Sequence, residues 1–352
     1  MIILIRFLLS PILVFFVPVY FLIFNIIKLT KQRRQKRYYG LKIICIGNIT
    51  LGGTGKTEIV KKIIQDLKNL KKSVAILTRG YKRKSKIPLF VSQQDNCSYD
   101  YVDKMGDEAF MLFNELKVHV FVNEKRKEAL NYLLEKKLAD IVICDDGLQD
   151  FSFYKDISVL VLNTMDFTKF QCLLPLGNLR EPFCFALKRV NFLILNHSKF
   201  VPDDLLESIK KKAKNINSRI KIITTNYIIK NFVNILTNKK FAPYEFLLLY
   251  KKINLSCGIA DPSVLIRMLE IEGFDIEKKF FYPDHYWYKI KNIKNIFKKS
   301  SFPLVITRKD AVRILKYLDK IEKFYLEKIF YIDIVLEITE GKDLWKELIN
   351  SV

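Results

Sequence analysis

The chain has 352 residues, of which 60 are Lys or Arg and 37 are Asp or Glu, so its formal charge is +23. Half of the residues are hydrophobic and Gly and Pro are few, which excludes a disordered, collagen-like or low-complexity chain. The length predicts about two domains. The six cysteines lack CxxC or Cys/His ligand spacing, so we expect reduced thiols and neither a disulfide framework nor a zinc site.

The first organised feature is an apolar segment at residues 7–27, FLLSPILVFFVPVYFLIFNII, which contains no charged side chain. As a helix it would extend about 30 Å, enough to cross a bilayer core. A basic cluster without an acidic residue follows, and it should stay on the cytoplasmic side beside anionic headgroups: Lys28, Lys31, Arg33, Arg34, Lys36 and Arg37.

We therefore predict that residues 1–39 form a membrane anchor with a basic flank. A cleaved signal peptide is disfavoured, because the basic residues follow the apolar run and no small-residue cleavage site is evident. A spanning helix, a helix lying in the interface and a buried core helix remain as alternatives, and Pro11 and Pro18 favour partial insertion.

Residues 42–57, KIICIGNITLGGTGKT, have the pattern of a strand, a glycine-rich turn and the start of a helix. Such a turn directs backbone N–H groups toward an anion at the helix N-terminus. Lys56 should reach the β- and γ-phosphates of a nucleotide, and the Thr57 hydroxyl should bind Mg²⁺. Thr50 stands where the strict pattern has a small residue such as Gly. The predicted nucleotide-binding residues are Thr50, Leu51, Gly52, Gly53, Thr54, Gly55, Lys56 and Thr57.

A second segment, at residues 140–149, begins with an apolar strand that ends in Asp145 and Asp146. Carboxylates at the carboxyl end of a strand lie where ligands bind in open parallel sheets, so we predict that these two serve a metal ion. The alternative is an ordinary turn, which Asp-Gly favours.

Strand and helix patterns alternate along the chain, which predicts an α/β fold with a mostly parallel, doubly wound sheet. Further strands are expected at residues 73–77, 118–122, 157–162, 190–195 and 219–224, and helices at 107–116, 124–137 and 203–214. We place a nucleotide-binding domain at 40–225, a Lys/Asn-rich connector at 226–250 and a smaller α/β lobe at 251–352. Strands of that lobe are expected at 255–260, 303–307 and 329–335.

Seven motifs occur in one order along the chain: GNITLGGTGKT (47–57), TRGY (78–81), GDEAFML (106–112), DDGLQ (145–149), PLGNLREP (175–182), PDH (283–285) and TRKDAV (307–312). This order resembles that of the tetraacyldisaccharide 4'-kinases of lipid A biosynthesis, over about residues 40–315 and at the hydrophobic amino terminus. The resemblance implies a P-loop NTPase-like fold with a smaller carboxy-terminal lobe.

The implied reaction transfers the γ-phosphoryl group of ATP, with Mg²⁺, to the 4'-hydroxyl of an acylated glucosamine disaccharide 1-phosphate. The implied location is the anionic surface of the inner membrane, with the catalytic domain on its cytoplasmic face. We expect neither a nucleic acid nor an obligate protein partner.

By the same resemblance, Asp107 is the base that activates the sugar hydroxyl, and His285 orients it. Arg180 falls at a nucleotide site and Glu181 near the metal. Phosphoryl transfer depends mainly on positioning and charge neutralisation, and a carboxylate held by an imidazole is a suitable general base. The carboxy-terminal lobe is expected to bring His285 to Asp107 by closing over the nucleotide, with the substrate in the cleft between the lobes.

The chain departs from the family pattern at three positions. Asp150 stands where His is common, Asn178 where Pro is more usual, and Arg308 where an acid is usual. None of these lies in the phosphate loop, but Asp150 follows the DDGLQ motif directly.

Two other functions compete. A P-loop GTPase or metallochaperone-type NTPase is suggested by ThrArgLysAsp (307–310), which loosely matches the guanine-reading Asn-Lys-x-Asp loop, although Arg308 replaces its Lys. A membrane-tethered nucleic-acid binder is suggested by the charge of +23, but no RNA- or DNA-binding motif accompanies it.

Overall fold

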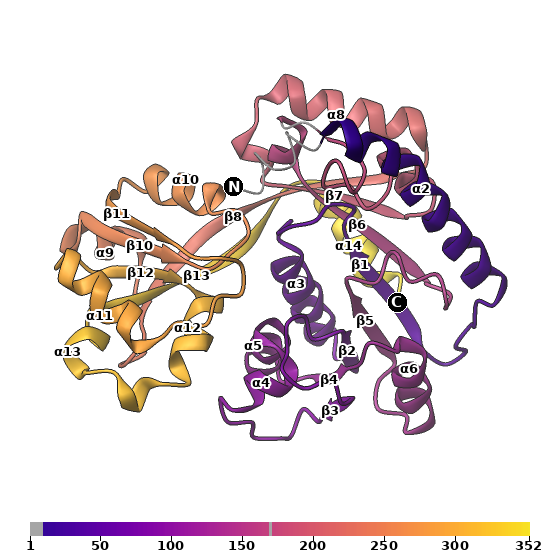
Figure 1. Cartoon of the computed structure of the whole chain (residues 1–352). Coiled ribbons are helices and arrows are strands. Elements are labelled where there is room, and N and C mark those ends of the chain that lie inside the picture. Colours follow the sequence, from indigo (N-terminus) through magenta and orange to yellow (C-terminus); the bar gives the residue numbers. More distant parts are fainter. Residues whose placement is uncertain (1–9, 169–170) are drawn as a thin grey trace. The chain divides into compact units, whose positions relative to one another are not determined.

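The computed structural model describes residues 10–168 and 171–352, and its chain divides into two compact units (Figure 1). Unit 1 contains Met1–Arg79, Val118–Asn226 and Ile338–Val352, and unit 2 contains Gly80–Lys117 and Tyr227–Glu337. The chain therefore passes between the units four times. Two of these passages lie within long strands, β8 (Lys221–Asn234) and β13 (Ile329–Glu340).

Unit 1 is built on a parallel sheet with the strand order β8-β7-β6-β1-β5-β2-β4. Its strands read as nearly continuous runs of Ile, Val and Leu, as expected when both faces of a parallel sheet are covered. Every residue of β2, β4, β6 and β7 is buried. The further strands are β1 (Lys42–Gly47), β2 (Val74–Thr78), β4 (His119–Val122), β5 (Ile141–Asp145), β6 (Ile157–Asn163) and β7 (Phe192–Asn196).

The helices of unit 1 include α3, which follows the phosphate loop and contacts β1, β2 and β5. Its apolar side chains recur at helical spacing and are all buried. The last helix of the chain, α14, packs on α3, and the Trp345 Nε1–H donates to Asp66 at 2.8 Å. The bounds are α2 (Ser10–Arg33), α3 (Lys56–Asn69), α6 (Arg126–Glu135), α7 (Phe183–Leu187), α8 (Asp203–Ile216) and α14 (Lys342–Asn350), with short 3-10 helices at Thr164–Thr168 and Ser198–Phe200.

Helix α2, indigo in Figure 1, contains most of the predicted apolar segment; residues 7–9 lie outside the described part of the chain. Over Pro11–Arg33 it is long and apolar enough to cross a membrane, and an 18-residue window within it has a mean hydropathy of 2.4. One side of it contacts unit 1: the Tyr20 hydroxyl donates to the Arg180 carbonyl at 2.8 Å, and Phe21 meets the edge of Phe185. Most of its other apolar side chains are exposed, so α2 is not a buried core helix.

Unit 2 has a smaller parallel sheet with the order β11-β10-β12-β13. The short strand β9 pairs antiparallel with β8. The strands are β3 (Leu89–Val91), β9 (Lys240–Phe241), β10 (Lys252–Cys257), β11 (Asp275–Phe281) and β12 (Leu304–Thr307). The helices are α4 (Tyr101–Met105), α5 (Asp107–Leu116), α9 (Pro243–Leu249), α10 (Ser263–Ile271), α11 (Ile290–Lys299), α12 (Arg308–Leu315) and α13 (Lys323–Leu326), with a 3-10 helix at Leu318–Lys320.

The connector expected at residues 226–250 is instead regular structure, formed by the second half of β8, β9 and α9. Besides its abundant Lys and Asn residues, this segment contains apolar side chains that are buried. Among them, Phe232 stacks on Phe246 with ring centroids 4.2 Å apart. A polar composition therefore did not mark a linker here.

The two units also differ from the predicted domains in their membership. Residues 80–117, expected in the nucleotide-binding domain, belong to unit 2, where α5 contacts α12 and Glu115 pairs with Arg308 at 2.6 Å. Conversely α14, expected in the carboxy-terminal lobe, belongs to unit 1. The unit to which a segment belongs depends on its packing against elements distant in sequence. Local sequence patterns do not predict that packing.

Candidate active site

The phosphate loop of unit 1 connects β1 to the first turn of α3. Gly52 and Gly55 have φ values of 123° and 80°, in the region where glycine is favoured. Gly55 is the residue that precedes α3, so Lys56 and Thr57 open the helix. Thr54 is buried, whereas Leu51, Gly52 and Gly53 are exposed. The loop thus presents a helix N-terminus and its backbone N–H groups, which suits an anionic ligand.

A segment from the LREP motif runs beside this loop. The Leu51 N–H donates to the Asn178 carbonyl at 2.8 Å, and the Arg180 N–H donates to the Ile49 carbonyl at 2.7 Å. Between them Thr50 and Leu179 form an antiparallel bridge. Thr50 is buried in this pairing, so the residue that departs from the strict glycine pattern anchors the loop to its neighbour.

Asp145 and Asp146 lie at the carboxyl end of β5, as predicted. The Thr78 hydroxyl donates to Asp145 at 3.5 Å. Asp146 lies 3.4 Å from the Lys56 ammonium and accepts a hydrogen bond of 3.0 Å from Arg180. Burial opposes the ionisation of Asp146, but the charges of Lys56 and Arg180 lower its pKa to about 2. An ionised Asp146 therefore connects the phosphate-loop lysine to the LREP arginine.

Glu181 is fully buried, and both of its carboxylate oxygens already have donors. Arg189 pairs with both oxygens, and the Gln149 amide donates to one of them at 2.8 Å. The same amide group donates to the Asn48 carbonyl at 2.8 Å. This arrangement disfavours the expected role of Glu181 beside a metal and makes it an anchor for the LREP segment.

Arg126 was not predicted from the sequence, yet it supports the DDG turn. It is fully buried and donates to the backbone carbonyls of Asp145 and Asp146 at 2.7 and 2.9 Å. It also lies 3.6 Å from the Asp150 carboxylate. Nothing marked it in the sequence, because a lone arginine at the start of a helix is usually solvated.

Asp150, which replaces a common histidine, is satisfied within the protein. It accepts hydrogen bonds from the Ser152 hydroxyl and N–H at 2.7 and 3.1 Å. Burial opposes its ionisation, while Ser152 and the charge of Arg126 keep its pKa below the ordinary value. The substitution thus contributes an ion pair to the support of the turn.

The predicted pair of Asp107 and His285 is present in unit 2. The His285 Nδ1 lies 3.0 and 2.9 Å from the two carboxylate oxygens of Asp107, and both side chains are buried. Asp107 is the first residue of α5, after Gly106, whose φ is 89° and where an added Cβ would lie 3.2 Å from the Tyr81 carbonyl oxygen. Because both members belong to one unit, no domain closure is needed to bring them together, contrary to our expectation.

A second unpredicted arginine completes this cluster. The Arg313 Nε–H donates to Asp107 Oδ2 at 2.8 Å, and its Nη2 contacts the same oxygen. Burial opposes the ionisation of Asp107, but His285, Arg313 and Lys309 together hold its pKa well below the ordinary value. The Tyr81 ring meets the His285 ring edge-on, with centroids 5.0 Å apart. The carboxylate of Asp107 is therefore kept ionised and fixed in direction.

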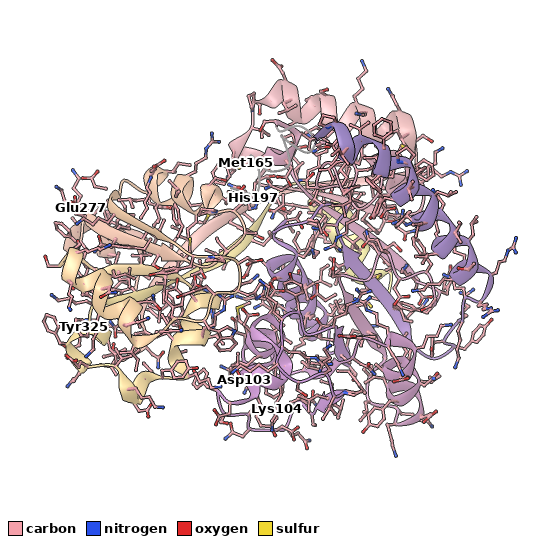
Figure 2. All side chains as sticks on the ribbon, in the orientation of Figure 1. Asp103, Lys104, Met165, His197, Glu277 and Tyr325 are labelled. Atoms are coloured by element: carbon pink, nitrogen blue, oxygen red, sulfur yellow. The ribbon has the colours of Figure 1, made fainter. Side chains whose placement is uncertain are left out.

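Nearby ion pairs fix the helices that carry this cluster. Lys309 pairs with Glu108, and Asp103 on α4, labelled in Figure 2, accepts hydrogen bonds from Lys84 and Lys316 at 2.9 and 2.6 Å. These pairs join α4 and α5 to the loop at residue 84 and to the segment that includes α12.

The ThrArgLysAsp segment does not form a base-reading loop. The Thr307 hydroxyl caps α12 by accepting the Asp310 N–H at 3.1 Å. Asp310 is fully buried and accepts from the Gly258 N–H at 3.2 Å and from Arg313 at 2.9 Å. A carboxylate that is buried and fully engaged cannot read a guanine base.

Among the described residues, no group of three or more His, Cys, Asp or Glu side chains is arranged to hold a metal ion. The oxygen groups near the phosphate loop include Thr57 on α3, Asp145 at the end of β5 and Asp146, which pairs with Lys56. Mg²⁺ commonly takes one or two protein oxygens and completes its octahedron with water and substrate phosphates, so this small set fits it.

Residues 6–352 match the family model described as tetraacyldisaccharide-1-P 4'-kinase. A tetraacyldisaccharide 4'-kinase of Francisella tularensis subsp. novicida is 32% identical over 332 residues, covering 91% of this chain and 94% of the relative. The enzyme of the same name from Legionella pneumophila (strain Lens) is 29% identical over 311 residues, covering 88% and 84%.

A solved structure agrees over nearly the whole chain. The crystal structure of the "apo" form of LpxK from Aquifex aeolicus in complex with ATP has a TM-score of 0.71 and 25% sequence identity, and 99% of each chain is covered.

Proposed function

The chain belongs to the tetraacyldisaccharide-1-phosphate 4'-kinase family, and from this premise we propose how its own residues bind ATP and transfer the phosphoryl group. The activity is that of a lipid A biosynthetic kinase that phosphorylates the 4'-hydroxyl of tetraacyldisaccharide 1-phosphate. ATP is the phosphate donor, as the ATP complex of the structural relative supports. The P-loop GTPase or metallochaperone alternative is not favoured by this membership.

Unit 1 would bind the nucleotide through the segment from Thr50 to Thr57. The N–H groups at the start of α3 face the phosphates, and the Lys56 ammonium neutralises their charge. Asp146 pairs with Lys56 through one carboxylate oxygen and with Arg180 through the other. When phosphates arrive, these two cations can exchange part of their interaction with Asp146 for the phosphate oxygens, so Arg180 is assigned to the nucleotide.

Mg²⁺ would be held by Thr57 and Asp145, and it would neutralise charge that develops on the phosphates. Asp146 contributes to the same region by ordering the cations around it. Glu181 is left out of this set, because Arg189 and Gln149 already occupy its oxygens.

Unit 2 would supply the base. The 4'-hydroxyl oxygen forms a bond to the γ-phosphorus while the bond to the β–γ bridging oxygen breaks and ADP leaves. The hydroxyl proton passes to Asp107, whose carboxylate is held by the Nδ1–H of His285. The observation that carries this assignment is the buried Asp107–His285 contact, since a base of low pKa acts only when it is well oriented.

Helix α2 would attach unit 1 to the inner membrane on its cytoplasmic side. Its exposed apolar side chains include Phe15, Leu22 and Ile26, and basic residues follow at its carboxyl end. These features suit an anionic lipid surface on which an acylated substrate resides.

The test uses the full chain in detergent with γ-labelled ATP or GTP and the acylated disaccharide 1-phosphate. Asp107→Asn keeps the size of the side chain but removes the proton acceptor, so label transfer should fall about 10³-fold. Binding of ATP should be unchanged, because the nucleotide residues lie in unit 1.

Asp319→Asn, at an exposed position of unit 2, is the matched control and should transfer label at the wild-type rate. A near-full rate for Asp107→Asn would overturn the assignment of the base. GTP turnover that is independent of the lipid would overturn the kinase assignment itself.

A further inference from the structure

Arg313 lies on the inner face of α12 and is fully buried. Its guanidinium donates to Asp107 Oδ2 through Nε at 2.8 Å, with Nη2 on the same oxygen. Its Nη1 donates to Asp310 at 2.9 Å and to the Gly258 carbonyl at 3.2 Å. One side chain therefore links the base to a second buried carboxylate and to the end of β10.

These contacts make the two oxygens of Asp107 unequal. Oδ2 receives two N–H groups of Arg313 besides the proton of His285 Nδ1, which lies between both oxygens. Within the part of the chain that the structure describes, Oδ1 receives the Glu108 N–H, at 2.9 Å, besides that shared proton. A carboxylate oxygen offers about two acceptor sites, so Oδ2 is saturated and Oδ1 is the oxygen able to take a further proton.

The charges around Asp107 come from three elements. Glu108 lies next to it on α5, but Lys309 of α12 pairs with Glu108. Asp310 of α12 is buried and its pKa is raised, first by burial and in part by Asp107. His285 and Asp284 come from the loop after β11. Arg313 is the cation that touches both Asp107 and Asp310, so it offsets two buried negative charges.

We propose that Arg313 is a positioning residue of the phosphoryl transfer: it saturates Oδ2 of Asp107, so that Oδ1 is directed to the 4'-hydroxyl, and it keeps the carboxylate ionised. The inference rests on the proposed role of Asp107 as the base. Arg313 touches neither substrate nor phosphate in this account and acts only through Asp107.

The test compares pH profiles of kcat and kcat/KM for the full-length enzyme and two variants. A base must be ionised to accept a proton, so activity is lost as the pH falls through its pKa. Arg313→Met removes a neighbouring positive charge, so the pH at which protonation of Asp107 abolishes activity should move upward. kcat should fall about 10- to 100-fold while KM for ATP changes less than about twofold.

Arg313→Lys restores the charge but not the two-pronged contact. We expect its acid limb to stay near that of the wild type, with kcat about 3- to 10-fold low because Oδ2 is less firmly held. Arg308→Met, on the same helix, is the control: it breaks ion pairs with Glu115 and Asp333 but does not touch Asp107. It should lower stability and leave the pH profile unchanged.

Folding is checked by circular dichroism and by the ¹⁵N shifts of the His285 ring, which report its contact with Asp107. If Arg313→Met does not fold, Arg313→Lys decides: a kcat equal to that of the wild type would overturn the proposal. A folded Arg313→Met whose kcat equals that of the wild type would also overturn it. If Asp107→Asn itself keeps its rate, the proposed base fails; if Asp107→Asn is inactive and the Arg313 variants behave like the wild type, only the present inference fails.

Discussion

Two groups of charged side chains, one in each unit, are held in opposite ways. In unit 1 the side chains of Lys56, Asp146 and Arg180 keep 16%, 31% and 27% of their surface exposed. In unit 2 those of Asp107, His285 and Arg313 keep 4%, 7% and 0%. The first group is proposed to receive an anionic ligand from water, and its cations are accessible to one. The second is proposed to present one oxygen in one direction, and packing and hydrogen bonds fix it.

The largest effect that tests this difference is expected from Lys56→Met. Loss of the ammonium should lower kcat/KM about 10²- to 10³-fold. The reason is that the variant lacks the fixed positive charge that stabilises the phosphate during transfer. The melting temperature should change little, since Lys56 is partly exposed and pairs with a partly exposed Asp146. Label transfer and thermal unfolding measure the two quantities.

The exposed Lys188→Met is the control for this variant and should behave as the wild type. A large loss of stability in Lys56→Met would contradict the difference between the two groups. It would show that the partly exposed group of unit 1 matters as much for folding as the buried group of unit 2.

A smaller effect is expected from pH acting on Asp146. Its pKa in the folded protein is lowered to about 2, so its contribution to stability is present above the unfolded pKa of ~3.9 and is lost as the pH falls toward 2. Asp146→Asn should remove about 1 kcal/mol at neutral pH and flatten this part of the profile. Urea unfolding at pH 7, 5 and 3 measures it, and added salt should shrink the difference. An equal pH slope in both proteins would show that other carboxylates cause the acid instability.

The smallest effect is expected from Tyr20→Phe in α2. The hydroxyl donates to the carbonyl of Arg180, whose side chain holds Asp146. Loss of one hydrogen bond should raise KM for ATP by about two- to fivefold through a looser LREP segment. Tyr244→Phe, at an exposed position of unit 2, is the control. An unchanged KM in Tyr20→Phe would show that α2 does not influence the partly exposed group of unit 1.

The sequence could predict the elements of both units where periodicity was strong. The helix expected at 107–116 has these same bounds, and the strands around the phosphate loop are each found within about two residues. It could not show β11, whose DIEKKFF sequence is polar because the strand lies at the edge of the sheet and keeps much of its surface exposed.

The two groups of charged residues also differ in how far local sequence predicts them. The phosphate loop and the DDG turn are contiguous motifs, so their local structure could be predicted from neighbouring residues alone. The buried cluster joins residues 178 and 206 positions apart, and only a family resemblance suggested Asp107 and His285. Arg126 and Arg313 were missed, because a buried arginine has the same local signature as a solvated one until its partners are known.

The contact between α2 and unit 1 has a practical consequence for protein engineering. Trimming the chain to begin after Arg33 would remove the exposed apolar side chains of the helix, which is the usual route to a water-soluble enzyme. It would also uncover Phe151, buried and in edge contact with Phe24, and strip the Phe185 ring of Phe21. A shortened enzyme would therefore lose one exposed apolar surface and gain another. Polar replacements on the outward face of the intact helix are the better design.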